Sequence, residues 1–177
     1  MAEFTQDIYD DLLEYEGGYT NDEHDSGGRT VYGITENYDK AFFDIVHPLF
    51  IAEEYEEAKA AAKYFYYNKY WLRSGADKID SVPIATQIFD ICVNMGFSRR
   101  KLLQLAYNDV ADGEKLVVDG IFGEKTIAAV NGYPNDERLN NKLVERRIEK
   151  YHDIVARNPA LGKFIKGWTR RAKGFLI

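Results

Sequence analysis

Residues Leu12–Thr35, LLEYEGGYTNDEHDSGGRTVYGIT, contain the most informative pattern in the chain. A carboxylate stands where a helix is expected to end, and a glycine pair follows it. A polar loop then carries a second carboxylate, and a further glycine pair precedes a short apolar run. This order predicts a helix, a reversal and a small β-structure that return two carboxylates to one place.

The residues before the first glycine pair predict a short amphipathic helix. Ile8, Leu12 and Tyr15 repeat at helical spacing and mark its buried face, and Thr5 supplies a capping hydroxyl. Glu16 shares that face, because it follows Leu12 by one helical turn. Gly17 and Gly18 are expected to end the helix there.

Two effects act on a carboxyl group at this position. Partial burial disfavours the ionised form, and so does the carbonyl-rich end of a helix. Both favour the protonated carboxyl that a general acid requires. The alternative is that Glu16 simply turns into water at the end of its helix.

The loop that follows predicts a return of the chain. Gly27-Gly28 permits a tight reversal, and the residues from Thr30 to Thr35 are typical of a short strand. A hairpin here would bring Asp25 towards the helix end. One neutral and one ionised carboxylate beside a sugar form the glycosidase arrangement, whereas the alternative for Asp25 is an aspartate that bonds its own turn.

The two motifs, E-G-G-Y at residues 16–19 and D-x-G-G-x-T-x-x-G-I-T at residues 25–35, resemble glycoside hydrolase family 108, the bacterial and phage N-acetylmuramidases. The resemblance implies that Glu16 is the catalytic acid. The layout is also similar to that of phage-type lysozymes, which place an Asp nine residues after the Glu and then a Thr. Asp25 fits that spacing, and Thr30 comes one residue earlier than it requires.

Residues 36–48 predict one or two short helices with Pro48 as a break. Residues 51–71 predict a strong helix that is rich in alanine and charged residues and carries an aromatic cluster at residues 64–67. Pro83 is expected to open another helix that Gly96 ends. The segment FDICVNMG, residues 89–96, resembles a conserved element of the same family. The Asn94 amide would hydrogen-bond a sugar acetamido group or Glu16; the alternative is a helix-capping amide.

The C-terminal half predicts further helices. Ser98 is expected to cap a helix over residues 99–109, and a long helix is expected to start at Asn135 or Asp136 and to break at Asn158-Pro159. Between them, the pattern D-G-x-x-G-x-x-T at residues 119–126 resembles a repeat of peptidoglycan-binding segments. Physically it predicts a tight glycine turn that leads into a helix, whether or not it binds a ligand.

Composition narrows the class of protein. The 177 residues suit one compact domain, and no apolar run approaches the roughly 20 residues of a membrane helix. Cys92 is the single cysteine and is expected to be a buried, inert thiol. Residues 1–62 carry 16 acidic and three basic side chains, whereas residues 138–177 carry 11 basic and three acidic ones. The basic end would attract an anionic polymer, or the two ends neutralise each other; nothing suggests a nucleic-acid partner.

The prediction is therefore a mainly α, lysozyme-like single domain over residues 1–177, with one small β-hairpin, a catalytic motif half at 1–97 and a C-terminal half at 98–177. The resemblance implies cleavage of the β-1,4 bond between N-acetylmuramic acid and N-acetylglucosamine in peptidoglycan by a monomer that uses no cofactor. The candidate catalytic residues are Glu16, Asp25 and Thr30, and the candidate substrate-binding residues are Tyr32 and Asn94. No metal site is expected, because His24, His47 and His152 are scattered and residues 22–25 lack an ordered ligand spacing.

Three rival functions stay open. A lytic transglycosylase would use the same acid on the same bond without an attacking water. A murein-binding or phage-structural protein would need neither carboxylate. The absence of a signal segment suits a phage endolysin that stays in the host cytoplasm until it is released to the cell wall, and a secreted interbacterial toxin is the next option.

Overall fold

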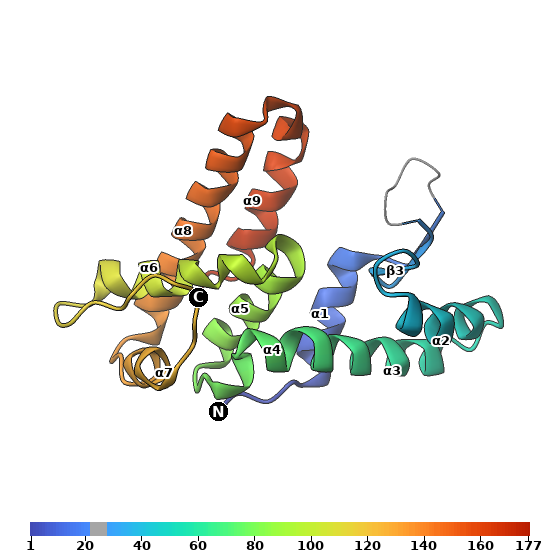
Figure 1. Cartoon of the computed structure of the whole chain (residues 1–177), viewed down its shortest axis with the longest axis horizontal. Helices are drawn as coiled ribbons and strands as arrows, with labels where there is room; N and C mark the ends of the chain where they lie inside the picture. Colours follow the sequence, from blue (N-terminus) through green and yellow to red (C-terminus); the bar gives the residue numbers. More distant parts are fainter. Residues whose placement is uncertain (22–27) are drawn as a thin grey trace. The chain divides into compact units, whose positions relative to one another are not determined.

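The computed structural model describes residues 1–21 and 28–177, and it confirms the mainly α architecture with one small antiparallel sheet near the N-terminus (Figure 1). Contacts divide the chain into two compact units. The N-terminal unit is Phe4–Arg73, and the C-terminal unit is Ser74–Ile177 together with Met1–Glu3. Each unit has its own buried side chains.

In its described residues, 4–21 and 28–73, the N-terminal unit contains three α-helices, a π-helical segment and three two-residue strands. The strands pair antiparallel in the order β1-β2-β3, with Tyr19 opposite Val31 and Val31 opposite Ile34. The expected single strand over residues 30–35 is therefore two strands with a tight turn between them. The elements are α1 Gln6–Glu16, β1 Tyr19–Thr20, β2 Thr30–Val31, β3 Ile34–Thr35, α2 Lys40–Ile51, α3 Tyr55–Tyr66 and η1 Tyr67–Trp71.

Two boundaries in this unit differ from the sequence prediction. Pro48 does not break the chain but lies inside α2, where the amides of Ala52 and Glu54 donate to the carbonyls of Pro48 and Leu49 at 3.0 and 2.9 Å. The buried apolar face of α2 offsets the local cost of the proline, since Phe43 and Val46 are 2% and 0% exposed. The next helix starts at Tyr55 rather than near residue 51, because Glu53 takes a left-handed conformation (φ 63°).

The core of the N-terminal unit lies between α2 and α3. Ala58 and Ala62 are fully buried, and their small side chains let the two helices approach closely. The Tyr9 hydroxyl donates to the Lys59 carbonyl at 2.8 Å, which ties α1 to α3. These contacts hold the end of α1 beside the sheet and the C-terminal end of α3.

The C-terminal unit is built from five main helices with short 3₁₀ connections. Pro83 lies in the first turn of α5, and Gly96 (φ 84°) ends that helix, as predicted. Helix α8 starts at Asp136, one of the two predicted positions, and the Asn135 side chain caps it by accepting from the Arg138 amide at 2.8 Å. Ser98 does not cap α6, because a 3₁₀ turn occupies that position. The elements are α4 Leu72–Ser74 at the junction of the units, η2 Ala76–Lys78, α5 Val82–Met95, η3 Phe97–Arg100, α6 Lys101–Val110, α7 Glu124–Asn131, α8 Asp136–Arg157, η4 Pro159–Phe164 and α9 Ile165–Lys173.

Helices α8 and α9 lie side by side (Figure 1), and Val144, Tyr151 and Ala172 form a buried cluster between them. Cys92 on α5 is 1% exposed, and this burial raises the pKa of its thiol to about 12. The prediction of a buried thiol is confirmed. Across the described ranges, no helix combines the length and the apolar character needed to cross a bilayer.

The D-G-x-x-G-x-x-T segment makes the predicted turn. The Asp119 carboxylate accepts from the Ile121 amide at 2.8 Å and from the Gln104 side chain at 2.9 Å, and Gly120 takes φ 80°. The Thr126 hydroxyl donates to the Ile121 carbonyl at 3.2 Å. The polar groups of this motif thus stabilise their own turn.

Candidate active site

Glu16 is the last residue of α1, as the sequence predicted. The Thr5 hydroxyl accepts from the Ile8 amide at the start of the helix, and Gly17 (φ 74°) ends it with its amide bonded to the Leu13 carbonyl. Ile8, Tyr9 and Leu12 form the buried face. Glu16 follows on that face and is half-buried, so its carboxyl group is partly shielded from water at a helix C-terminus.

A two-residue turn between β2 and β3 faces this carboxyl group. Tyr32 and Gly33 have φ values of 48° and 74°, which is the backbone of a type I′ hairpin turn. The Tyr32 amide donates to the Gly18 carbonyl at 2.9 Å, so the turn is fastened to the glycine pair that ends α1. The sequence pattern thereby brings the helix end and the hairpin turn together.

Gly33 is the point where the hairpin turn comes closest to Tyr66 and Glu16. A Cβ atom built on it would lie 2.3 Å from the Tyr66 hydroxyl and 2.9 Å from Oε2 of Glu16. Both distances are far below a normal contact, and a left-handed backbone is unfavourable for any side chain. Only glycine therefore lets the carboxyl group and the phenol approach this turn together.

Tyr66, at the C-terminal end of α3, completes the environment of Glu16. Its ring is 1% exposed, and its hydroxyl donates to the Tyr32 carbonyl at 2.8 Å. Burial raises the pKa of Tyr66 well above its usual value of 10, and the negative charge of Glu16 raises it further. The phenol therefore stays neutral and fixes the turn against the helix end.

The π-helical segment η1 continues the site. Burial raises the pKa of Tyr70, the nearby charge of Lys69 lowers it, and Asp39 and Glu16 both raise it. The charges of Asp39, Lys69 and Glu16 therefore all act on the Tyr70 hydroxyl. A π-helical turn is frequent at functional sites, and here it directs Lys69 and Tyr70 to the same group of charges.

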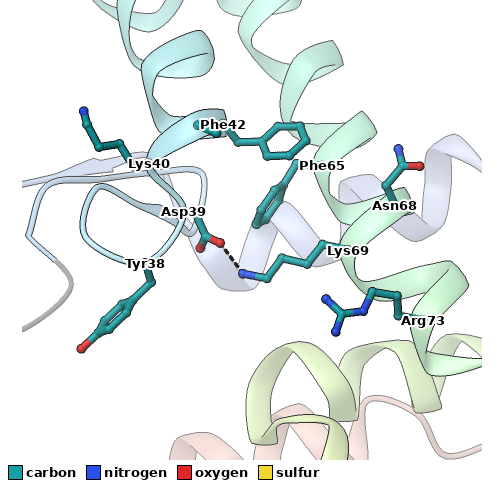
Figure 2. A pocket seen from close by; sticks show the side chains of 9 residues that line it. Tyr38, Asp39, Lys40, Phe42, Phe65, Asn68, Lys69 and Arg73 are labelled. Atoms are coloured by element: carbon teal, nitrogen blue, oxygen red, sulfur yellow. Dashed lines mark hydrogen bonds and ion pairs between the residues drawn. The ribbon is translucent and has the colours of Figure 1, made fainter.

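A pocket of about 400 Å³ opens beside these residues. Figure 2 shows Lys69 paired with Asp39 and Arg73 extending from the following turn of the helical segment. Lys69 also lies 5.0 and 5.2 Å from the ring centroids of Phe65 and Tyr70. The pocket is lined by Tyr38, Asp39, Lys40, Ala41, Phe42, Phe65, Asn68, Lys69 and Arg73.

This volume and mixture suit a polar ligand with apolar faces, such as a sugar ring. Asp39 pairs with Lys69 and has only 11% of its side chain exposed. Asn68 and Arg73 add hydrogen-bond donors. The pKa of Tyr70 is raised both by Asp39, which lines the pocket, and by Glu16. The N-terminal unit thus combines a partly shielded carboxyl group with a polar pocket.

The other predicted residues of this unit differ in what the structure shows of them. Thr30 lies on β2 with its hydroxyl 3.4 Å from the Gly28 carbonyl, and its catalytic role stays a prediction. Tyr32 is 7% exposed and packs edge-on against Phe50, so it holds the turn, and its contact with a sugar stays a prediction. Asp25 and the carboxylate loop at residues 22–25 lie outside the described residues. Within the described ranges, no group of three His, Cys, Asp or Glu side chains is placed to hold a metal ion.

Asn94 lies on α5 in the C-terminal unit, within a buried polar network. Its Oδ1 accepts from the Tyr151 hydroxyl at 2.7 Å, and the Tyr151 oxygen accepts from Nε of Arg147 at 2.8 Å. Arg147 is fully buried and pairs with Asp90 at 2.5 Å, and Arg171 pairs with the same carboxylate at 2.7 Å. Asn94 is therefore more than a helix cap, because Tyr151 of α8 holds its side chain.

A guanidinium group can only donate, so the Tyr151 oxygen accepts from Arg147, and the Tyr151 hydroxyl donates its own proton to Asn94. The acceptor on Asn94 is then its amide oxygen. The NH₂ group is left as the donor that a sugar acetamido carbonyl would require.

Sequence reasoning missed Gly33, Tyr66 and the Lys69–Asp39 pair as parts of the site. The Tyr-Gly dipeptide between β-branched residues was a usable signal for a type I′ turn. The aromatic cluster at residues 64–67 is visible in the sequence, but periodicity does not tell which of its rings faces Glu16.

The comparisons with known proteins agree with this architecture. Residues 9–96 match the family model described as glycosyl hydrolase 108, and residues 98–173 match the model described as a predicted peptidoglycan domain. The solved structure titled "Structure of Brucella abortus SagA" is similar, with a TM-score of 0.68 and 25% sequence identity over 96% of this chain and 89% of that chain. The comparison with curated proteins finds no match.

Glu16, Gly33 and Tyr66 all fall within the first matched segment, and α6 to α9 fall within the second. The two segments together account for nearly the whole chain and carry both resemblances noted in the sequence. The chain thus belongs to the glycosyl hydrolase 108 family, with a C-terminal predicted peptidoglycan domain.

Proposed function

We propose that this peptidoglycan hydrolase is an N-acetylmuramidase that cleaves the β-1,4 bond between N-acetylmuramic acid and N-acetylglucosamine. The family assignment supports glycosidase activity on peptidoglycan. The observation that supports the finer proposal is the half-buried Glu16 carboxyl group, held at a helix C-terminus against Gly33 and Tyr66. A carboxyl group fixed in this position is suited to act as the general acid of glycoside hydrolysis.

In this mechanism Glu16 protonates the leaving glycosidic oxygen as the bond to the muramic acid C1 breaks. Asp25 stabilises the positive charge that develops at C1, or it takes a proton from the attacking water. Thr30 positions that water. Whether the configuration at C1 is inverted or retained depends on the separation of the two carboxyl groups, since a nucleophilic carboxylate must lie closer than one that acts through water.

The polar pocket beside Tyr70 is the proposed position for a neighbouring sugar. Asn68 and Arg73 offer donors to its hydroxyl and acyl oxygens, and Phe42 and Phe65 offer apolar contact. In the C-terminal unit, the Asn94 NH₂ group is the proposed donor to an acetamido carbonyl. The enzyme acts as a phage or prophage endolysin that is held in the host cytoplasm until it is released to the cell wall.

The test is mass spectrometry of purified murein after digestion, with borohydride reduction to label free reducing ends. Hydrolysis leaves reducing muramic acid ends, whereas a lytic transglycosylase leaves 1,6-anhydromuramic ends because no water attacks. Reducing muramic ends that disappear with Glu16→Gln support the proposal. Anhydro ends would replace it with the transglycosylase, and no product would favour a binding protein. Glu14→Gln is the matched control, because Glu14 is exposed on the same helix.

A further inference from the structure

A second pocket lies in the C-terminal unit, entirely within the segment that matches a predicted peptidoglycan domain. It has a volume of about 340 Å³, within the size range of small-ligand sites. It forms where α6 ends, α7 ends and α8 begins. No catalytic role in the proposed mechanism falls on any residue that lines it.

Two tyrosines make a fixed wall of this pocket. The rings of Tyr107 and Tyr133 meet edge to face, with centroids 6.0 Å apart. The Tyr133 hydroxyl donates to the Val110 carbonyl at 3.1 Å, which ties the segment after α7 to the end of α6. Ala129 and Gly132 contribute the small surfaces beside them. The wall is therefore preorganised and partly apolar.

Charges of both signs line the same pocket. Arg138 stands in the first turn of α8, where its amide is bonded to the Asn135 cap, and Asp112 follows the end of α6. Among the described residues, neither side chain takes part in an ion pair. Nearby charged groups are paired instead: Arg146 binds Asp109 at 2.5 Å, and Lys125 binds Glu114 at 2.5 Å. Arg138 and Asp112 thus remain available to a ligand.

The negative charge on this side of the pocket comes from Asp112 itself. Carbonyls at the end of α6, those of Asn108 and Ala111, already accept hydrogen bonds from the Lys115 ammonium group. This side of the pocket favours an amine. A guanidinium group binds a carboxylate through two parallel hydrogen bonds, so the Arg138 side favours an acid.

We propose that this pocket binds the peptide stem of peptidoglycan, which carries carboxylates and, in uncrosslinked stems, a free amine beside small alanine side chains. The stem amine pairs with Asp112, a stem carboxylate pairs with Arg138, and alanine methyl groups contact Tyr107 and Tyr133. The neutral hydroxyl and acetamido groups of the glycan would not require two opposite charges. The inference rests on peptidoglycan being the substrate, and it assigns the stem to the C-terminal unit.

The test is co-sedimentation of the full chain with purified sacculi, with Glu16→Gln present throughout so that the sacculi are not digested. In this background Arg138→Ala and Asp112→Asn should each weaken binding roughly tenfold, since each leaves one charge of the stem unpaired. Arg157→Ala and Asp153→Asn are the controls. Each removes a charge of the same sign at a position on α8 outside the pocket and should leave binding unchanged. Equal binding by all four variants would overturn the proposal.

A second comparison identifies the bound component. Sacculi stripped of their stems by an amidase should lose the binding that depends on Arg138. If stripped sacculi bind as well as intact ones, the glycan is the ligand and the stem assignment is wrong. Ala129→Trp fills the pocket without removing a charge and should also weaken binding, with an unchanged melting temperature as the check on folding.

The failure of this inference can be told apart from a failure of the proposed function. In chains that retain Glu16, the pocket variants should release reducing ends from peptide-free glycan strands at the normal rate. If Glu16→Gln still releases those ends, the proposed function fails whatever the pocket variants do.

Discussion

The hydroxyl of Tyr66 donates a hydrogen bond to the backbone carbonyl of Tyr32 at 2.8 Å, across 34 residues of sequence. This one bond joins the end of α3 to the turn between β2 and β3. The same hydroxyl lies where a side chain on Gly33 would have to be, next to Glu16. The environment of the candidate acid therefore depends on three segments, each of which restricts the others.

Gly33→Ala should destabilise the protein and reduce its activity together. The left-handed backbone alone costs about 1–2 kcal/mol for a residue with a Cβ, and the contacts with Tyr66 and Glu16 add to that. Urea denaturation measures the free energy of unfolding, and lysis of a cell-wall suspension measures activity. Gly167→Ala is the control: it lies in α9 with open space around it, so alanine should be neutral or stabilising there. A normal unfolding midpoint for Gly33→Ala would contradict the close approach.

Glu16→Gln should keep the fold and lose at least about a hundredfold in rate, the range that general acid catalysis contributes. Glutamine has nearly the same shape, so the packing against Gly33 and Tyr66 should persist, but it cannot give up a proton to the glycosidic oxygen. Turbidity assays and thermal melts read the two properties separately. Near-normal clearing by this variant would remove Glu16 from its assigned role.

Asp25→Ala should reduce the release of reducing ends strongly, because hydrolysis needs a group to activate water or to stabilise charge at C1. Asp22→Ala, in the same polar loop, is the matched control. Normal rates for Asp25→Ala, with anhydro products, would instead point to a transglycosylase.

Asn94→Asp and Tyr151→Phe should separate substrate binding from stability. Aspartate still accepts the Tyr151 proton but has no NH₂ group, so KM for soluble murein fragments should rise while the unfolding midpoint changes little. Phenylalanine at position 151 leaves the buried Arg147 Nε without its acceptor and should lower the free energy of unfolding by about 1–3 kcal/mol. A normal KM for Asn94→Asp would exclude its amide from substrate contact.

The Arg29–Glu36 pair should make stability depend on acid pH. Two hydrogen bonds from the Arg29 guanidinium, at 2.7 and 2.8 Å, lower the pKa of Glu36 from 4.5 to about 2. Because the folded value is the lower one, the stabilising contribution is present above pH 4.5 and is lost as the pH falls towards 2. Glu36→Gln removes it, so its urea midpoint should fall below that of the parent at pH 6 and converge with it near pH 2. A gap of constant size across this range would contradict the assignment.

Local patterns were enough to predict most of the helices. These predictions depend on residues adjacent in sequence: Glu16 at the end of α1, Gly17 and Gly96 as helix ends, Pro83 near the start of α5 and the start of α8 at Asp136. The expected break at Pro48 was wrong, because contacts outside the local pattern decided the outcome. Proline does disfavour a helix interior, but the burial of the apolar face of α2 outweighed that preference.

The division of the chain shows the same limit. The sequence motifs and the family models change near residue 97, whereas the contacts change between Arg73 and Ser74. Helix α5 carries the last part of the first motif half, yet its Asp90 and Asn94 are held by residues of α8 and α9. Periodicity identified the buried face of α5 but not the helices that would cover it.

The amino-acid sequence by itself determined the family, the mainly α class and the position of Glu16 at a helix end, because motif order, helical period and glycine stops are local properties. Only the tertiary structure decided that Gly33 and Tyr66 enclose that carboxyl group and that Tyr151 orients Asn94. Those contacts join residues far apart in the chain, and their geometry follows from the packing of whole helices, which no local pattern encodes.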